Sequence, residues 1–385
     1  MKTIVNIISR EHPLAAYLFV KEYFEPGDKL LFIASHENFE CITPLVNCLK
    51  IDKEQVQRIV LRRDEDMYTY ERICRTIQDN VAKEGEYYVN LAGGTRYMAL
   101  SVQHVFSNFN AQFFYVQTHE NLIVKTIFDN SILDNDDEIF PIKHKMSLGE
   151  YLEVHGLSHD LDQQQPPVGD EAQLQYMFYL FANRKLRSSD YKILDTLRES
   201  YRGWKYLNIK EVEHPVNDKM VPIRTLSRFL DFLHFVPKEK GVLQREELEF
   251  LTGGWFEEYV YYLIKKNVVP DEIAIGVHID GCTDIKHNNE LDVSFIKNNQ
   301  FFVIECKSGI NSESMFNEIV YKVCALKEVL LGLDCHSYIF SLKRDEKGDL
   351  KRIAQYMDIR FCDYDCMTRD DKMQKQLKEM LKLAR

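Results

Sequence analysis

Two acidic side chains and a lysine are spaced so that a β-hairpin would bring them together. Asp292 lies in one stretch of alternating apolar residues, and Glu305 and Lys307 lie at the end of the next. The residues between these stretches are typical of a turn, and a two-residue loop at 298–299 sets Asp292 opposite Glu305. The same register sets Glu290 opposite Lys307. The predicted hairpin therefore puts two carboxylates within roughly 5 Å of each other at Cβ.

This acidic pair predicts a specific chemistry. Opposed carboxylates destabilise a sheet unless a cation or a shared proton relieves their repulsion, and two hard oxygen ligands suit Mg²⁺ or Mn²⁺. Residues i and i+2 of a strand project to the same face, so the Lys307 ammonium stands beside Glu305. There it can orient a water molecule or stabilise phosphorane charge. The alternative is a surface hairpin with an exposed Glu290–Lys307 salt bridge, which leaves the opposed Asp292 and Glu305 unexplained.

The spacing of these residues, an aspartate, twelve intervening residues and then Glu-x-Lys, resembles the PD-(D/E)xK restriction-endonuclease superfamily. The resemblance implies hydrolysis of phosphodiesters by a metal-activated water, with Asp292 and Glu305 as metal ligands and Lys307 as a further catalytic residue. The proline of the family name is absent here, because Glu290 and Leu291 precede the aspartate.

A third metal-facing carboxylate is expected from the helix predicted over residues 253–264. The string F-E-x-x-V at 256–260 resembles the first motif of the same superfamily, which favours Glu257 over Glu258 as a catalytic residue and metal ligand. The alternative is that either glutamate, taken alone, only stabilises the helix by interacting with the dipole at its N-terminus. An α/β restriction-endonuclease-like core is completed by a predicted helix and strand at 316–326 and 336–342.

The amino-terminal half has a different pattern, in which short apolar strands alternate with helical segments. Such alternation predicts a Rossmann-like, doubly wound parallel sheet, so the whole chain is of the α/β class. Ligands of such sheets bind beyond the carboxyl ends of the strands. The predicted strands cover residues 3–8, 29–34, 57–61, 86–91 and 112–116.

One of these strand ends carries a glycine pair followed by a predicted helix. Gly93 and Gly94 let backbone amides approach a ligand closely, and the helix N-terminus attracts a phosphate, with Thr95 and Arg96 as further donors. No GxxxxGK[ST] motif is present, which argues against a nucleoside triphosphatase. By itself, Gly-Gly-Thr also suits an ordinary tight turn between a strand and a helix.

A Rossmann-like domain with Gly-Gly-Thr-(Lys/Arg), placed before a PD-(D/E)xK domain, resembles the CARF nucleases of type III CRISPR systems over nearly the whole chain. The resemblance implies a homodimer that binds a cyclic oligoadenylate, commonly cyclic tetra-adenylate, across its two-fold axis. This ligand switches on the nuclease domains. Arg96 stands where many relatives have lysine, which keeps the charge but changes the contact geometry. By the match, half of the pocket is formed by Ser9, Arg10, Gly93, Gly94, Thr95 and Arg96.

The same resemblance implies an activity. Members with this domain pair cleave single-stranded RNA and single-stranded DNA and nick or cut duplex DNA with Mn²⁺ or Mg²⁺, in antiviral defence. Two other classes stay open: a ring nuclease whose CARF domain degrades its ligand, and a ligand-responsive DNA-binding regulator with an inactive nuclease fold. The ring size of the activator, the physiological metal and the preference between DNA and RNA also stay open.

The predicted organisation has four parts. Residues 1–142 form the CARF domain, which senses the ligand and dimerises, and residues 143–171 form a linker. Residues 172–250 form an extension that is either helical or winged-helix-like. Residues 251–385 form the nuclease domain.

Composition sets the remaining expectations. The chain has 385 residues, 45% of them hydrophobic, and no apolar run approaches the roughly 20 residues of a membrane span. Its nine cysteines form no CxxC pair, which favours a reducing cytoplasm; Cys362 and Cys366 are expected as buried thiols rather than as zinc ligands with His336. A net charge of −11 argues against tight, constitutive binding of nucleic acid and suits local contact. Basic residues that either serve such contact or remain solvated are Lys265, Lys266, Lys343, Arg344, Lys351 and Arg352.

Overall fold

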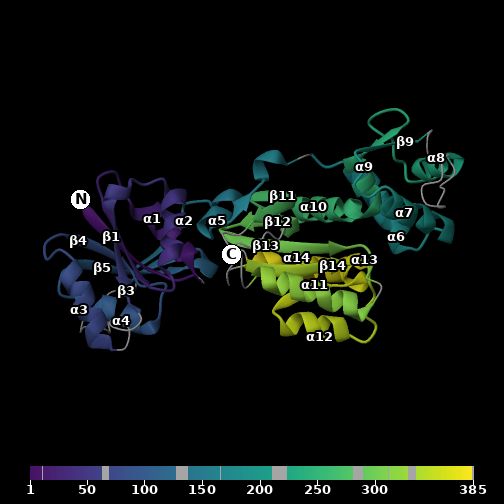
Figure 1. Ribbon diagram of the computed structural model, residues 1–385. Coiled ribbons are helices and arrows are strands. Elements are labelled where there is room, and N and C mark those ends of the chain that lie inside the picture. Colours follow the sequence, from purple (N-terminus) through teal and green to yellow (C-terminus); the bar gives the residue numbers. More distant parts are fainter. Residues whose placement is uncertain are drawn as a thin grey trace.

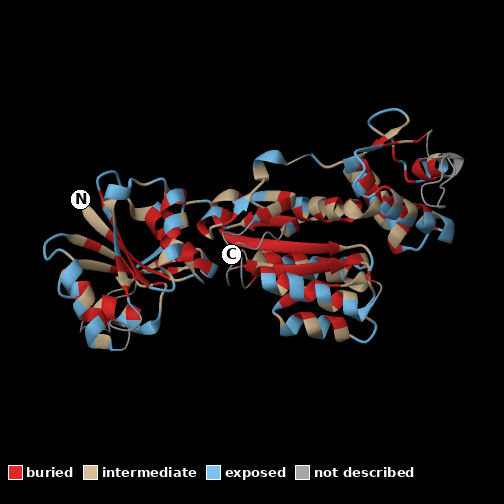
Figure 2. Ribbon diagram, in the orientation of Figure 1, coloured by how far each residue is buried: buried red, intermediate tan, exposed pale blue. Residues whose placement is uncertain are grey.

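The computed structural model describes residues 1–10, 12–62, 69–126, 138–164, 166–209, 223–280, 289–310, 312–327 and 335–383. Two α/β units lie side by side, each built on its own sheet, and a smaller part rich in helices lies beyond the second unit (Figure 1). Buried residues concentrate on the sheets and on the inner faces of the covering helices (Figure 2). None of the helices in the described ranges combines the length and the apolar character needed to cross a membrane.

The amino-terminal unit is a seven-stranded sheet covered by helices. Its strands are β1 (Lys2–Ile8), β2 (Lys29–Ser35), β3 (Val56–Leu61), β4 (Glu86–Asn90), β5 (Asn110–Gln117), β6 (Leu122–Thr126) and β7 (Glu138–Pro141). The helices are α1 (Pro13–Tyr23), α2 (Ile42–Leu49), α3 (Tyr70–Asn80) and α4 (Arg96–Phe106). The order is β3-β2-β1-β4-β5-β6-β7, with the first five strands parallel, which confirms the predicted doubly wound sheet. The antiparallel strands β6 and β7 were not predicted.

Successive side chains of a strand point to opposite faces of the sheet, which gives this unit two apolar layers. Ile4 and Ile8 of β1 pack with α1 and α2, whereas Val5 and Ile7 pack with α3 and α4. Both faces of the parallel sheet are therefore covered, as its near-continuous apolar strands require. The strand order reverses between β1 and β4, which are hydrogen-bonded neighbours. The loops after these two strands consequently lie at one crevice, where ligands of doubly wound sheets bind.

The carboxyl-terminal unit has a mixed six-stranded sheet in the order β15-β14-β13-β12-β11-β8. Its strands are β8 (Ser158–His159), β11 (Glu272–Asp280), β12 (Asn289–Lys297), β13 (Gln300–Lys307), β14 (Cys335–Ser341) and β15 (Ile359–Cys362). Its helices are α10 (Trp255–Asn267), α11 (Glu313–Ala325), α12 (Asp349–Tyr356), α13 (Tyr364–Thr368) and α14 (Asp370–Leu383). The predicted succession of helix, hairpin, helix and strand is confirmed, with β8, β11 and β15 as unpredicted additions.

The β12–β13 hairpin has the register that the sequence predicts. Residues 298 and 299 both adopt left-handed backbone conformations, with φ of 49° and 61°, as a two-residue hairpin loop requires. Pairing runs from Lys297 with Gln300 to Val293 with Ile304. The ladder ends one residue before Asp292 and Glu305, so the two acids project where the strands begin to separate.

The extension combines helices with a two-stranded antiparallel sheet. Its elements are α6 (Glu171–Ala182), α7 (Ser188–Ser200), β9 (Tyr206–Asn208), α8 (Ile223–Phe232), β10 (Val242–Gln244) and α9 (Arg245–Glu249). It packs on α10 through two stacked aromatic pairs, Phe178 with Tyr259 and Phe181 with Trp255. The pairing of β9 with β10 gives this extension a small sheet beside its helices.

The segment predicted as a linker, residues 143–171, contains regular structure and connects the two units, and it is called the joint below. Helix α5 (Leu148–Val154) begins with a capping box in which Ser147 and Glu150 satisfy each other's backbone amides. Tyr151 stacks on Phe301 of β13 at 4.3 Å, and β8 joins the second sheet as an edge strand. This segment therefore belongs to the packed core between the units.

The turn of the β12–β13 hairpin also touches the amino-terminal unit directly. The Asn299 side chain accepts a hydrogen bond from Met146 N (2.8 Å) and donates to Asn121 Oδ1 (2.7 Å) and to the His144 carbonyl (2.9 Å). Gln300 Nε2 donates to the carbonyl of Thr118. One end of this hairpin is thus held by the first unit and the joint.

Candidate active site and ligand loop

The two predicted carboxylates and the lysine meet at the open end of the β12–β13 hairpin. Lys307 Nζ lies 3.0 Å from Asp292 Oδ2 and 2.8 Å from Glu305 Oε1. Asp292 and Glu305 are 5% and 2% exposed, so their charges are poorly solvated. The Cys306 amide donates a further hydrogen bond to Asp292 Oδ2 at 2.7 Å. The Lys307 ammonium therefore contacts both carboxylates, and the backbone of β13 also holds Asp292.

A second lysine, which the sequence analysis did not identify, completes this cluster. Lys322 of α11 donates to both oxygens of Glu305, each at 3.1 Å. Its signal in the sequence is weak: Lys322 borders the buried stripe that contains Ile319 and Val323, in a helix expected to cover the sheet. A long cationic side chain at such an edge can reach a buried acid.

Glu257 and Glu258 have separate surroundings. Glu257, in the first turn of α10, interacts electrostatically with Asp292, whereas Glu258 accepts hydrogen bonds from the amides of Val168 and Gly169, each at 2.8 Å. Glu258 is thereby committed to holding the segment that precedes α6. The structure thus groups Glu257, and not Glu258, with the acids of the hairpin.

The ionisation of the cluster reflects burial and like charge. Burial and the Asp292 charge raise the pKa of Glu257 to about 9, and burial and the Glu305 charge raise the pKa of Asp292 to about 6. For Lys307, burial lowers the pKa, but the charges of Asp292 and Glu305 outweigh it and hold the pKa well above its usual range. The surroundings therefore do not stabilise a third negative charge in the cluster, and without a bound cation Glu257 is protonated at neutral pH.

The repulsion among these three acids is the observation that favours a divalent cation at the site. Within the described ranges, no three His, Cys, Asp or Glu side chains already surround a common point as a metal cage, and the Lys307 ammonium lies between two of the acids. The donor set nevertheless fits Mg²⁺ or Mn²⁺, since it consists of hard carboxylate oxygens whose repulsion a cation relieves. Gly276 of β11 lies across from Asp292 and presents no side chain there.

The raised pKa of Glu257 predicts how metal-free protein responds to pH. Because the folded-state value of about 9 exceeds the ordinary 4.5, the stabilisation from the protonated form is complete below pH 4.5 and is lost as pH rises towards 9. Glu257→Gln should therefore raise the melting temperature in EDTA more at pH 8 than at pH 5. Thermal unfolding checks this, with exposed Glu346→Gln as the control. Equal shifts of the melting temperature at both pH values would contradict the prediction.

The glycine loop is shaped by its approach to β1. Gly93 and Gly94 have φ of +112° and +62°, and a Cβ on them would lie 2.3 Å from the Ile7 carbonyl oxygen and the Ile7 Cγ2, respectively. Thr95 is the N-cap of α4 and accepts from Met98 N at 3.3 Å. Both glycines are thus required by the fold itself.

The remaining predicted ligand residues lie around the same crevice. Ser9 Oγ accepts from His12 N at 3.3 Å, and Arg10 N donates to Asn38 Oδ1 at 3.3 Å. The side chains of Arg10 and Arg96 are exposed. The loops that follow β1 and β4 therefore carry two exposed cations.

A buried amide pair that the sequence analysis overlooked lies beneath the crevice. Asn6 and Asn90 face each other across β1 and β4, and Asn90 Nδ2 donates to Asn6 Oδ1 at 3.0 Å. Asn90 also accepts from Ala92 N at 3.0 Å, which supports the glycine loop. An asparagine inside an apolar strand is the signal that would have identified the pair.

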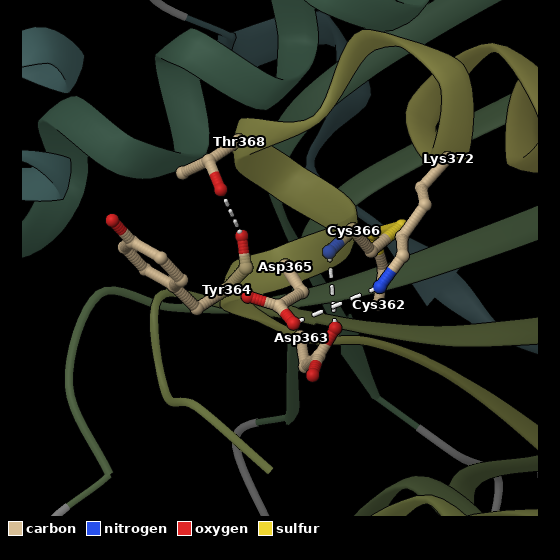
Figure 3. The surroundings of a disulfide bond; sticks show 7 residues. All are labelled: Cys362, Asp363, Tyr364, Asp365, Cys366, Thr368 and Lys372. Carbon is tan, nitrogen blue, oxygen red and sulfur yellow. Dashed lines mark hydrogen bonds and ion pairs between the residues drawn. A yellow bond between two sulfur atoms is a disulfide. The ribbon is translucent and has the colours of Figure 1, made fainter. Parts of the chain in front are cut away.

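The carboxyl end of β15 corrects one expectation. Cys362 and Cys366 form a disulfide bond, whereas they were expected as free thiols (Figure 3). Asp363 caps α13 by accepting from Cys366 N at 3.0 Å, and this turn brings the two Cα atoms within 5.3 Å. The alternative zinc site with His336 is wrong as well, because a disulfide offers no thiolate ligands and His336 lies at the opposite end of β14.

Comparison with known proteins agrees with this geometry. Residues 3–151 match a family model described as the Card1 CARF domain, and residues 244–382 match one described as Card1-like, endonuclease domain. No curated protein matches the sequence. Protein VC1899 from Vibrio cholerae is similar in structure, with a TM-score of 0.74, 18% identity and coverage of 100% of this chain and 98% of that chain.

A second solved structure is similar over its whole length. Can2 from Sulfobacillus thermosulfidooxidans, solved in complex with cyclic tetra-adenylate, gives a TM-score of 0.66 at 19% identity, with 100% of both chains covered. A type III CRISPR defence DNA nuclease activated by cyclic oligoadenylate gives 0.50 at 12% identity over 89% of this chain and 45% of that chain. The chain thus joins a Card1-type CARF domain to a Card1-like endonuclease domain, which is the domain pair that the sequence predicts.

Proposed function

We propose that this chain is a homodimeric nuclease that requires a divalent metal and is activated by a cyclic oligoadenylate, most directly cyclic tetra-adenylate. One observation carries the catalytic part: Lys307 contacts both Asp292 and Glu305 at the open end of the β12–β13 hairpin, and Glu257 acts on them electrostatically. The substrates are single-stranded RNA, single-stranded DNA and duplex DNA. The Can2 complex supports the choice of activator.

The proposed mechanism assigns one task to each side chain. Asp292, Glu305 and Glu257 hold Mn²⁺ or Mg²⁺, which when bound supplies positive charge to the phosphate and lowers the pKa of a water molecule. Lys307 orients the attacking water and neutralises charge that develops on the phosphate. Lys322 holds the Glu305 carboxylate in place from α11.

The proposed ligand site lies at the crevice between β1 and β4. Ser9, Arg10 and the Gly93–Arg96 loop of each protomer contact the ring, and the two-fold axis of the dimer pairs two such crevices. Exposed guanidinium groups suit the ring phosphates, and close approach of the loop backbone suits their oxygens.

Cleavage assays test the proposal as a whole. Labelled single-stranded RNA, single-stranded DNA and supercoiled plasmid are incubated with Mn²⁺, with and without cyclic tri-, tetra- or hexa-adenylate. Cutting that requires one ring size supports the switch and the chemistry together. Bound ligand without cutting under any combination would reject the nuclease function, and linear product from the ring itself would favour a ring nuclease.

Arg96 provides a separate prediction for the ligand site. Arg96→Ala should raise the activator concentration for half-maximal cleavage at least tenfold, because it removes one charge-assisted contact from each protomer, each worth roughly 1.5–3 kcal/mol. The cleavage rate at saturating activator should be unchanged. Arg75→Ala, at an exposed cation on α3, is the matched control. Superimposable activation curves for Arg96→Ala and the control would exclude Arg96 from the pocket.

A further inference from the structure

The extension reverses the charge of the chain. Residues 183–209 contain seven lysines and arginines against three acidic residues, in a protein whose net charge is −11. This stretch lies between the two family matches, which end at 151 and begin at 244. A polyanion that approaches this acidic protein is attracted locally here.

The loop from α7 to β9 exposes two aromatic rings among its cations. All five residues from Arg202 to Tyr206 are exposed, and Trp204 and Tyr206 are 45% and 59% accessible. Two exposed rings that alternate with cations in one short loop are the combination that base stacking and phosphate contact require. Within the described parts of the chain, no ion pair engages Arg202 or Lys205, so both charges are available to phosphates.

The loop is held in a defined position. Buried Tyr201 and Leu207 flank it, the Trp204 ring packs edge-on against Tyr201 at 5.1 Å, and the Lys205 carbonyl accepts from Arg245 N at 3.0 Å. The loop is therefore ordered before it binds a ligand, so little conformational entropy is lost on binding.

The helix that carries this loop is anchored next to the catalytic elements. In the last turn of α7, the Arg198 guanidinium donates to the Thr252 carbonyl, five residues before Glu257. At the end of α6, the Ala182 carbonyl accepts from Tyr364 Oη at 2.9 Å. Figure 1 shows α6 and α7 at the end of the second unit that faces away from the first unit.

We propose that the Arg202–Tyr206 loop binds single-stranded nucleic acid: bases stack on Trp204 and Tyr206, and Arg202 and Lys205 contact phosphates. Stacking requires unpaired bases, so duplex is excluded from these rings. The proposal deepens the proposed nuclease function, on which it rests, by assigning a substrate contact outside the metal centre. Long single strands then span both sites, whereas short ones reach the catalytic centre alone.

Tryptophan fluorescence tests the contact directly. The chain has two tryptophans and Trp255 is 1% exposed, so solvent-accessible emission reports Trp204. Titrating the full chain in EDTA with a 20-nucleotide oligothymidylate, with and without cyclic tetra-adenylate, should quench this emission, and a 20-base-pair duplex should not. Trp204→Phe should abolish the quenching but keep the affinity within a few fold. Oligothymidylate binding without quenching would overturn the proposal.

Fluorescence anisotropy with labelled oligothymidylate measures the contribution to affinity. Trp204→Ala/Tyr206→Ala should weaken binding at least tenfold, since each stacked base contributes roughly 1–3 kcal/mol. Tyr356→Ala/Lys378→Ala, at an exposed ring and an exposed cation elsewhere, should leave binding unchanged. Equal affinity for both double variants would reject the loop as a binding site.

Cleavage separates this proposal from the nuclease function itself. With activator and Mn²⁺, the Trp204→Ala/Tyr206→Ala protein should lose at least tenfold in kcat/KM on the 20-mer and cut a hexamer at the normal rate. Quenching and weakened binding without cutting of any strand would reject the nuclease function and leave the loop contact standing. Normal kcat/KM on the 20-mer would reject the loop contact and leave the nuclease function standing.

Discussion

Glu305→Ala should lower the activated cleavage rate by roughly a thousandfold or more, because the cation that it helps to hold stabilises the transition state by several kcal/mol. The same change leaves Lys307 and Lys322 without the carboxylate that each now contacts. Gel assays with saturating activator and Mn²⁺ measure the rate. Lys307→Ala should have a comparable effect, since it removes the group that orients water.

Two observations make this test specific. Binding of cyclic tetra-adenylate, measured by calorimetry, should be unchanged, because Glu305 lies in the other unit from the glycine loop. Glu346→Ala, at an exposed glutamate elsewhere in the same unit, is the matched acidic control and should cut at the normal rate. Glu305→Ala protein that retains full activity would refute the assignment of the catalytic centre.

Asn299→Gly should lower both stability and activation. Glycine keeps the left-handed turn, since Asn299 has φ of 61°, but it removes the hydrogen bonds with Met146, Asn121 and His144. Leaving such buried partners unsatisfied costs about 1–3 kcal/mol per group, so the free energy of unfolding should fall by roughly 3 kcal/mol. Urea denaturation measures this loss.

The neighbouring residue supplies the control for this prediction. Asn298 is exposed and also left-handed, with φ of 49°, so Asn298→Gly changes the same turn without breaking the contact to the first unit. We expect cyclic tetra-adenylate to stimulate Asn298→Gly normally and Asn299→Gly several-fold less. Equal stimulation of the two variants would mean that the turn does not couple the domains.

The hairpin could be predicted from the sequence because its turn and its two strands are adjacent in the chain. A two-residue Asn-Asn turn between alternating apolar strands sets one register, in which Val293 pairs with Ile304, and a slip of one residue would turn both side chains to the other face of the sheet. The glycine loop was also recognisable from adjacent residues, Gly93, Gly94 and Thr95, although the close approach to Ile7 that requires the glycines is a tertiary contact. Spacing along the chain therefore identified the acids of the cluster.

Other features depend on tertiary contacts that spacing does not encode. Lys322 reaches Glu305 from a separate helix, and Glu258 is bound by amides some ninety residues earlier in the chain. Gly276 interrupts the alternation of β11, which hid that strand. The Cys362–Cys366 bond depends on how Asp363 turns the chain after β15. Each of these was decided by packing or backbone geometry that the sequence pattern leaves open.

The β12–β13 hairpin also acts as a spacer of fixed length between the two domains. From Asn299 to Glu305 the strand covers about 20 Å, at roughly 3.3 Å per residue. Inserting one residue into each strand would turn both acids to the opposite face, whereas inserting two would restore the face but move the centre further from the joint. Chimeras that exchange the amino-terminal domain must therefore preserve this strand length and the residues that form hydrogen bonds with Asn299. Cutting the chain within 143–171 alone would not separate the two domains cleanly.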